Sequence, residues 1–198
     1  LGVAAQLAAG IDGHVVALSF DEVASEELAS WGADAIVAFG RDALEEDVAR
    51  AVCAWTDQAA PWAVLAPSTA WGREVASRAA ARLSAGLTGD AVALEVDADG
   101  KLCAWKPAFG GQLVAAIGAT SPVQMATVRL GMLPTLVARP ATPVPSTTTA
   151  VEATSRVTVR ARTREDNLDT LGEATAVVGV GKGVDPAHYA QLDELPAD

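Results

Sequence analysis

Short apolar runs alternate with helix-like segments from residue 15 to residue 84 of the chain. Each apolar run has the length of a strand buried in a parallel sheet, and each is followed by a segment whose apolar residues recur every three or four positions. The sequence therefore predicts strands at 15–19, 35–39 and 61–67 and helices at 22–31, 42–58 and 71–84. Strands that alternate with helices favour a doubly wound, mainly parallel α/β sheet.

Beyond residue 86 the pattern changes. Strand-like runs at 91–96, 101–106, 112–117 and 124–129 follow one another with no helical pattern between them. The segment 97–100 has the composition of a hairpin turn, because Gly100 can take the positive φ that such turns need. We therefore expect an added set of short, partly antiparallel strands.

The chain divides into three parts on the same reasoning. Residues 1–145 form the α/β domain, 146–173 a linker and a returning strand, and 174–198 the start of a second domain. Four prolines between 134 and 145 mark a surface linker, partial alternation at 151–162 predicts the returning strand, and the run at 175–179 predicts the first strand of the new unit.

The first ten residues are typical of a helix that stops at Gly10. A domain of this class that opens on a helix lacks the strand that normally precedes it. We therefore expect the N-terminus to be truncated.

Charge excludes several functions. The chain has 14 lysines and arginines against 25 aspartates and glutamates, a formal net charge of −11. A negative field without a basic block argues against nucleic acid binding. No uncharged apolar run reaches the length of about 18 residues that a membrane span needs. Cys53 and Cys103 form no CxxC pair, so we expect packed thiols in a reducing compartment, the cytoplasm.

A glycine-rich turn is the first candidate for chemistry. Gly181, Lys182 and Gly183 follow the predicted strand at 175–179 and precede a helix expected from about Pro186. Such a turn can cradle a phosphate, although its spacing matches neither GxxxxGK[ST] nor GxGxxG. The alternative is a tight strand-to-helix turn without a ligand.

The loop from Ser68 to Arg73 is the second candidate. It joins the carboxyl end of a predicted strand to a helix N-terminus, where free amides and Arg73 can hold an anion. The alternative is an ordinary helix start with Thr69 as its N-cap.

No catalytic constellation accompanies these candidates. His14 and His188 are the only histidines, they lie in unrelated segments, and no GxSxG motif is present. The acidic cluster of Glu45, Glu46 and Asp47 is expected to be a solvated helix face at the positive end of the helix dipole. The residues thus indicate a scaffold or binding domain and not an enzyme.

Two long motifs carry a family resemblance. Residues 73–90, REVASRAAARLSAGLTGD, resemble the GR(D/E)…AARL…GLTGD segment of electron transfer flavoprotein alpha subunits. The pair PAFGG at 107–111 and QMATVR at 124–129 resembles that family's pair in order and separation. The resemblance runs from about residue 1 to about residue 195.

The resemblance implies a Rossmann-like fold of the adenine nucleotide alpha hydrolase type, followed by the start of an FAD-binding domain. It also implies a beta subunit as partner, in a heterodimer that carries electrons from dehydrogenases to a membrane quinone reductase or a similar acceptor. FAD would belong to the full-length parent, with none bound by this chain alone.

The glycine turn departs from the family pattern. Gly181, Lys182 and Gly183 stand where the family has a Gly-Gly-Arg-Gly turn, so the cation is kept but the planar guanidinium is lost. The resemblance therefore implies only an FAD-adjacent role for these three residues. Two other readings stay open: a stand-alone adenine-nucleotide-binding module that uses the Ser68–Arg73 loop, and a subunit-interaction domain without a ligand.

Overall fold

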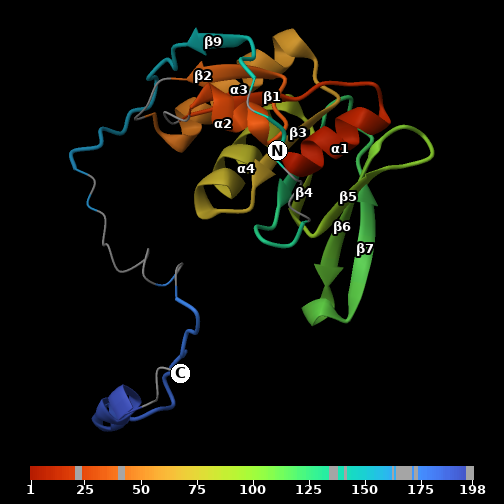
Figure 1. The fold of residues 1–198 in the computed structure, drawn as a ribbon. Helices are drawn as coiled ribbons and strands as arrows, with labels where there is room; N and C mark the ends of the chain where they lie inside the picture. The colour runs from red at the N-terminus through yellow and green to blue at the C-terminus, as the bar shows by residue number, and fades with distance from the viewer. Residues whose placement is uncertain are drawn as a thin grey trace. The chain divides into compact units, whose positions relative to one another are not determined.

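The computed structural model describes residues 1–20, 24–39, 43–133, 138–140, 142–161, 163, 171 and 174–194, and the chain divides into two units, 1–156 and 157–198 (Figure 1). Nearly all of the regular structure belongs to the first unit. The expected division into 1–145, 146–173 and 174–198 stays a prediction.

The first half of the first unit alternates helices and strands as the hydrophobic pattern predicts. In chain order the elements are α1 (Gly2–Gly10), β1 (Val16–Ser19), α2 (Ser25–Ser30), β2 (Ala35–Phe39), α3 (Glu45–Ala59), β3 (Ala63–Pro67) and α4 (Ala70–Leu83). Two of the predicted helix starts, at residues 22 and 42, lie outside the described residues. Gly32 ends the α2 segment with φ +110°, a conformation in which a side chain would be strained.

The second half supplies strands: β4 (Gly86–Ala91), β5 (Ala93–Val96), β6 (Leu102–Ala108), β7 (Leu113–Gly118), β8 (Gln124–Val128) and β9 (Ser146–Thr149), with a single 3₁₀ turn, η1 (Phe109–Gly111), between β6 and β7. Two parallel sheets have the orders β1-β2-β9 and β3-β8-β4, and an antiparallel sheet has the order β5-β6-β7. This confirms an α/β fold with an added antiparallel part, in which the β6–β7 hairpin projects from the first unit (Figure 1).

Two predicted strands are wrong, and one strand of the structure was not predicted. The strand expected at 151–162 is wrong over its described residues 151–161, and the returning strand is β9 instead, paired in parallel with β2. The valines of the predicted segment, Val157 and Val159, are exposed to solvent. The strand expected at 175–179 is absent for a similar reason, since Val177 and Val178 are exposed and pair with no neighbouring strand. A third element, β4, was not predicted.

Burial corrects the interpretation of the acidic cluster on α3. Asp47 is only 2% exposed and is not part of a solvated face. Its Oδ1 accepts hydrogen bonds from the backbone and side chain of Thr154, both at 3.1 Å, and from Arg50 at 2.9 Å. Burial alone would raise the pKa of Asp47, but these hydrogen bonds outweigh it and lower the pKa. These hydrogen bonds hold the segment around Thr154, near the end of the first unit, against α3.

Alternating residues of β3 pack on different helices. Val64 and Ala66 join the cluster formed by α3 and α4, whereas Ala63 and Leu65 join the cluster that contains Leu7 of α1. Because successive side chains of a strand point to opposite faces, α1 and the α3–α4 pair cover opposite faces of β3. This is the two-sided cover that a doubly wound sheet requires.

Small residues allow α4 to lie close to β3. A Cβ on Gly72, in the first turn of α4, would lie 2.1 Å from the carbonyl oxygen of Pro67 at the end of that strand. Gly72→Ala is therefore expected to lower the free energy of unfolding by at least about 1–3 kcal/mol, because backbone must shift to make room. Urea unfolding measures it.

Gly10→Ala is the matched control. Its added Cβ would lie 3.9 Å from the nearest side-chain atom, on Val96, and alanine favours the helix, so stability should change by no more than about 1 kcal/mol. Equal unfolding midpoints for the Gly72 variant and the unaltered chain would contradict the close approach of α4 to β3.

Candidate functional site

The carboxyl ends of β3, β8 and β4 meet in a polar network. The hydroxyl groups of Ser68 and Thr127 are 3.0 Å apart and both are buried. Thr127 Oγ1 also accepts a hydrogen bond of 2.8 Å from the backbone N–H of Asp90. One side chain on the central strand thus joins the ends of both neighbouring strands, at the edge where doubly wound sheets usually hold ligands.

An ion pair closes the network on its solvent side. The Arg129 guanidinium donates to Oδ2 of Asp90, which itself stands in the left-handed region with φ +65°. The hydrogen bond from Arg129 holds the pKa of Asp90 at about 2, helped by a hydrogen bond from Ser68 and by the charges of Arg129 and Arg73. The pair was not predicted, although its two members end the motifs GLTGD and QMATVR.

The Ser68–Arg73 loop uses its own donors. Arg73 donates to the carbonyl oxygen of Ser68 from Nε at 3.0 Å and from Nη2 at 2.8 Å. The N–H of Gly72 donates to Thr69 Oγ1 at 3.0 Å, which confirms Thr69 as the N-cap of α4. An incoming phosphate would have to displace these internal bonds, so the geometry favours the N-cap interpretation over the anion site.

The glycine turn is described separately, in the second unit. Gly181, Lys182 and Gly183 are exposed, and the N–H of Val184 donates to the carbonyl of Gly181 at 3.1 Å. A Cβ on either glycine would meet no atom within 4 Å, so no neighbouring group forms a cradle around the turn. His14 and His188 likewise lie in different units. Among the described residues, no three His, Cys, Asp or Glu side chains gather closely enough to hold a metal ion.

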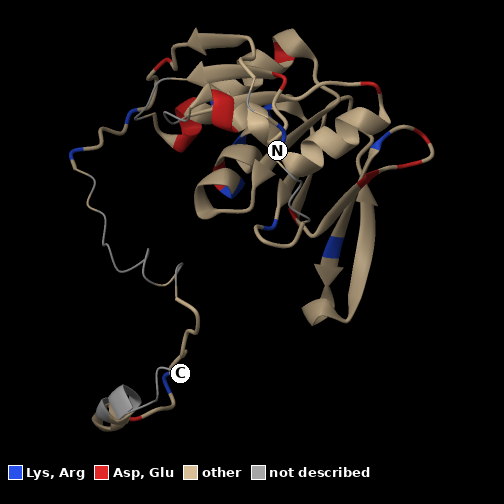
Figure 2. Ribbon diagram, in the orientation of Figure 1, with Lys and Arg blue, Asp and Glu red and all other residues tan. Residues whose placement is uncertain are grey.

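Exposed apolar side chains lie at the tip and edge of the β6–β7 hairpin. We call this surface the hairpin patch, and it consists of Phe109, Leu113, Val114 and Ile117. Phe109 is 78% exposed and has a φ of +50°, with Gly110 and Gly111 also at positive φ. From Pro107 to Gly118 the hairpin contains no charged residue, whereas the β5–β6 turn and α3 carry clustered acidic residues (Figure 2).

β7 adds an open sheet edge to this patch. It pairs with β6 on one side and ends the antiparallel sheet on the other. An exposed, uncharged edge strand tends to pair with another chain, and soluble proteins usually protect such an edge with charges or cover. The arrangement can therefore bind protein by contact of Phe109 and by strand addition along β7.

The described residues of the first unit thus form an α/β domain with an exposed apolar hairpin. Comparison with known proteins identifies the class: residues 1–159 match the family model of the electron transfer flavoprotein domain. The chain belongs to this family. The motifs at 73–90, 107–111 and 124–129 lie inside the matched region, and Gly181–Gly183 lies beyond it.

Individual relatives place the chain more closely. It is 33% identical over 188 residues to the electron transfer flavoprotein subunit alpha of Clostridium acetobutylicum, covering 88% of this chain and 56% of the relative. It is 33% identical over 163 residues to Protein FixB of Bradyrhizobium diazoefficiens (79% and 44% covered). It is 31% identical over 196 residues to subunit LctC of the lactate dehydrogenase (NAD(+),ferredoxin) of Acetobacterium woodii (93% and 47% covered).

The family is therefore that of the alpha subunits and FixB proteins, as the two motifs indicated. The chain spans about half the length of the curated relatives it matches. No helix among the described residues is long and apolar enough to cross a membrane.

Acid is expected to weaken the network through Asp90. The pKa of this carboxyl is about 2 in the folded chain and near 3.8 when unperturbed. A lowered pKa contributes stability above the unfolded value, and this contribution is lost as pH falls from about 4 towards 2. Asp90→Asn should therefore destabilise the chain at neutral pH, and its difference from the unaltered chain should shrink across that interval in urea unfolding.

Asp57→Asn is the control, because Asp57 is an exposed residue of α3. Its effect on the free energy of unfolding should not show the pH dependence expected for Asp90→Asn. A difference for Asp90→Asn that is the same at pH values of about 2 and about 7 would rule out the role of the ion pair.

Proposed function

We propose that this chain is the scaffold and subunit-interface domain of an alpha subunit in a heterodimeric electron transfer flavoprotein. Its partner is a beta-type subunit, and the hairpin patch is the surface that binds it. The parent complex carries electrons from dehydrogenases to a quinone reductase or a similar acceptor. The exposure of Phe109 on an uncharged hairpin is the observation that carries the proposal.

The hairpin patch has the chemistry of an interface centre. Such centres are depleted in charge and enriched in aromatic residues, and a few buried anchors dominate their binding energy. The side chain of Phe109 is an aromatic group of this kind and is exposed to solvent, as are the aliphatic side chains of β7 in the hairpin patch. The unpaired edge of β7 offers backbone hydrogen bonds to a partner strand as well.

The patch is also rigidly placed. Six residues of β6, from Cys103 to Ala108, pair with β7 from Gly118 to Leu113, so the hairpin is held in register along its length. At its base the side chain of Gln124, on β8, accepts a hydrogen bond of 2.8 Å from the N–H of Leu102. This buried bond ties the antiparallel sheet to the parallel one, and preorganised surfaces bind with less loss of entropy.

FAD is assigned to the parent protein and not to this chain alone. A flavin site encloses most of its ligand and pairs the pyrophosphate with donors or cations. The turn of Gly181, Lys182 and Gly183 offers amides and one cation but has no surrounding wall, so the described residues do not fit a complete flavin pocket. We propose that the turn lies beside the flavin in the parent, where other residues enclose the cofactor.

Removal of the aromatic anchor should weaken subunit binding. For Phe109→Ser we expect the dissociation constant of the complex with a beta-type subunit to rise about tenfold or more, in line with a hot-spot loss above about 1.4 kcal/mol. Titration calorimetry with the purified subunit measures the change, and size exclusion of the mixture checks that a complex forms.

Met132→Ser is the matched control, since Met132 is also an exposed apolar residue but lies outside the hairpin. It should leave the affinity within about twofold of the original value. No complex with the unaltered chain, or equal losses for both variants, would refute the proposed interface.

The chain on its own should not retain flavin. After incubation with excess FAD and desalting, we expect a colourless protein, because the turn must order itself and has no enclosing groups. The visible absorbance of flavin provides the measurement, and Lys182→Ala should behave identically. Stoichiometric flavin that survives desalting would place the pocket within residues 1–198 and overturn the assignment.

A further inference from the structure

A single charged side chain stands on the projecting hairpin. From Leu102 to Gly118 the sequence contains Lys106 and no other charged residue, so no carboxylate accompanies it on β6 or β7 (Figure 2). Lys106 comes directly before the uncharged stretch that carries the hairpin patch. A cation beside an exposed apolar surface can favour one partner over another, because a partner must supply the opposite charge at that point.

The strand register places Lys106 on the same face of the hairpin as two residues of the hairpin patch. Lys106 lies opposite Ala115 in the β6–β7 ladder, and residues two positions away in each strand share its face. That face therefore carries Leu113 and Ile117, which are 47% and 37% exposed, on either side of the pair. We call Lys106, Leu113, Ala115 and Ile117 the inner face of the hairpin.

The inner face continues into the core beside the parallel sheet. Ala104, two residues before Lys106, is 1% exposed and belongs to one core cluster with alanines of β4 and β8. A Cβ built on Gly89 of β4 would lie 3.9 Å from Nζ of Lys106 and 4.0 Å from Oγ1 of Thr127. The ammonium group of Lys106 therefore lies close to the carboxyl end of β4, beside the polar network.

The two arginines of that network have partners, whereas Lys106 has none among the described residues. Arg73 donates to the carbonyl oxygen of Ser68, and Arg129 donates to the carboxylate of Asp90. No ion pair within the described residues involves Lys106. Three cations thus gather near one carboxylate, which gives a local excess of positive charge in a chain whose net charge is −11.

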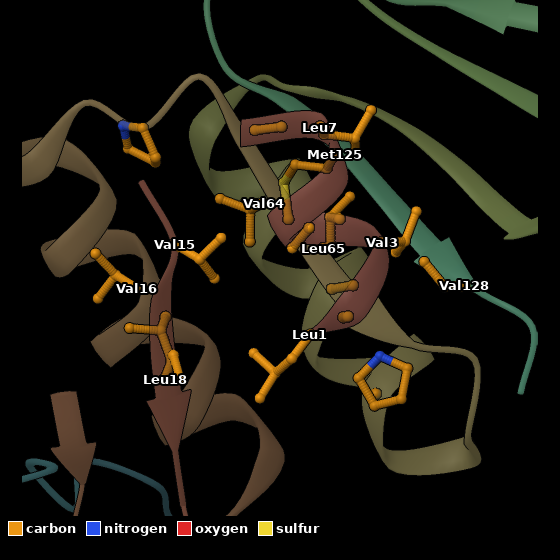
Figure 3. Close-up of a pocket in the computed structure, with 18 of the residues that line it drawn as sticks. Leu1, Val3, Leu7, Val15, Val16, Leu18, Val64, Leu65, Met125 and Val128 are labelled. Atoms are coloured by element: carbon orange, nitrogen blue, oxygen red, sulfur yellow. The ribbon is translucent and has the colours of Figure 1, made fainter. Parts of the chain in front are cut away.

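The large cavity of the first unit offers Lys106 no counter-ion. It lies between β1 and β3, has a volume of about 890 Å³, and is lined by apolar side chains such as Leu18 and Leu65 (Figure 3). Its charged or titratable lining side chains are His14 and Arg129, and Lys106 does not line it. A carboxylate can therefore reach Lys106 only from the solvent side of the inner face.

A second copy of this chain is a poor source of that carboxylate. Two chains with a net charge of −11 repel each other over a distance, and the acidic residues of each copy cluster on α3 and the β5–β6 turn (Figure 2). A different protein can meet the inner face with a carboxylate and still approach without this repulsion. The charge of the inner face therefore favours a heterologous partner.

We propose that the inner face selects the beta-type subunit, which places an aspartate or glutamate carboxylate on Nζ of Lys106. This proposal rests on the function proposed above. Apolar side chains of the partner on both sides of that carboxylate pack on Leu113 and Ile117 and exclude water from the ion pair. Because a charge pair is stronger where water is excluded, Lys106 contributes to affinity as well as to orientation.

The test removes the charge of Lys106 and keeps its length. Lys106→Met retains an unbranched apolar side chain, so it preserves contacts of the lysine stem and deletes only the ammonium group. We expect the dissociation constant with the purified beta-type subunit to rise about tenfold for Lys106→Met and about a hundredfold for Lys106→Glu. Lys106→Arg, which keeps the charge, should stay within about threefold. Titration calorimetry measures all three, after urea unfolding has verified that each variant is folded.

Salt provides a readout that packing alone would not change. The affinity of the unaltered chain should fall with added salt more steeply than the affinity of Lys106→Met, because ions screen the approach of the two charges. Lys101→Met is the matched control, since it removes an exposed lysine at the start of the same hairpin. It changes the net charge equally and should leave the dissociation constant within about twofold.

Four results would overturn the proposal while the complex itself forms. They are binding of Lys106→Met that is as tight as that of the unaltered chain, equal losses for Lys101→Met, an equal loss for Lys106→Arg, and equal salt dependence of the unaltered chain and Lys106→Met. A complex that Phe109→Ser weakens and Lys106→Met does not would leave the proposed function standing and rule out the inner face alone. No complex with the unaltered chain would overturn both, and a dimer of this chain that Lys106→Met abolishes would make a second copy the occupant.

Discussion

The buried hydroxyl group of Thr127, on β8, joins the carboxyl ends of β3, β4 and β8. Its side chain is 1% exposed, so it must find its hydrogen bonds inside the protein. It finds them in the hydroxyl of Ser68 and the N–H of Asp90. The second bond accompanies the left-handed backbone of Asp90 and the irregular pairing of β4 with β8 after Thr88. That conformation in turn presents the carboxylate of Asp90 to Arg129. The positive φ of Asp90, the register shift of β4 and the ion pair with Arg129 therefore all accompany the hydrogen bond to this one buried oxygen.

The packing of the first unit depends on small side chains. Its core contains many alanines, among them Ala49, Ala79 and Ala126, and these small side chains let helices approach the sheet closely. Helices that lie so close to the sheet leave no room for larger side chains. At Gly72, for example, the backbone of Pro67 occupies the space that a Cβ would need. The hydrogen bond from Leu102 to Gln124 joins the antiparallel sheet, which carries the projecting hairpin, to the parallel sheet in this core.

The alternation of helices and strands could be predicted because hydrophobic periodicity is local and strong in the first 84 residues. β4 was missed because Gly86, Gly89 and Asp90 interrupt its apolar residues, and its strand character comes from pairing with the distant β8. The burial of Asp47 was missed for a related reason. Acidic residues in a first helical turn are usually solvated, and its partner, Thr154, is 107 positions away. In the candidate site, Thr69 could be predicted as an N-cap, because capping depends on residues next to one another in the sequence. The ion pair of Asp90 and Arg129 could not, since each member looks like an ordinary strand end.

The interface that we propose has a consequence for the protein in the cell, because the hairpin patch is exposed in a copy without its partner. Until a partner binds, Phe109 and the edge of β7 remain in water, and such surfaces are what chaperones and proteases recognise on incompletely assembled proteins. An orphan copy would be marked for retention or degradation by the same residues that are hidden after assembly. The proposed interface would thereby also keep the abundance of the two subunits in balance.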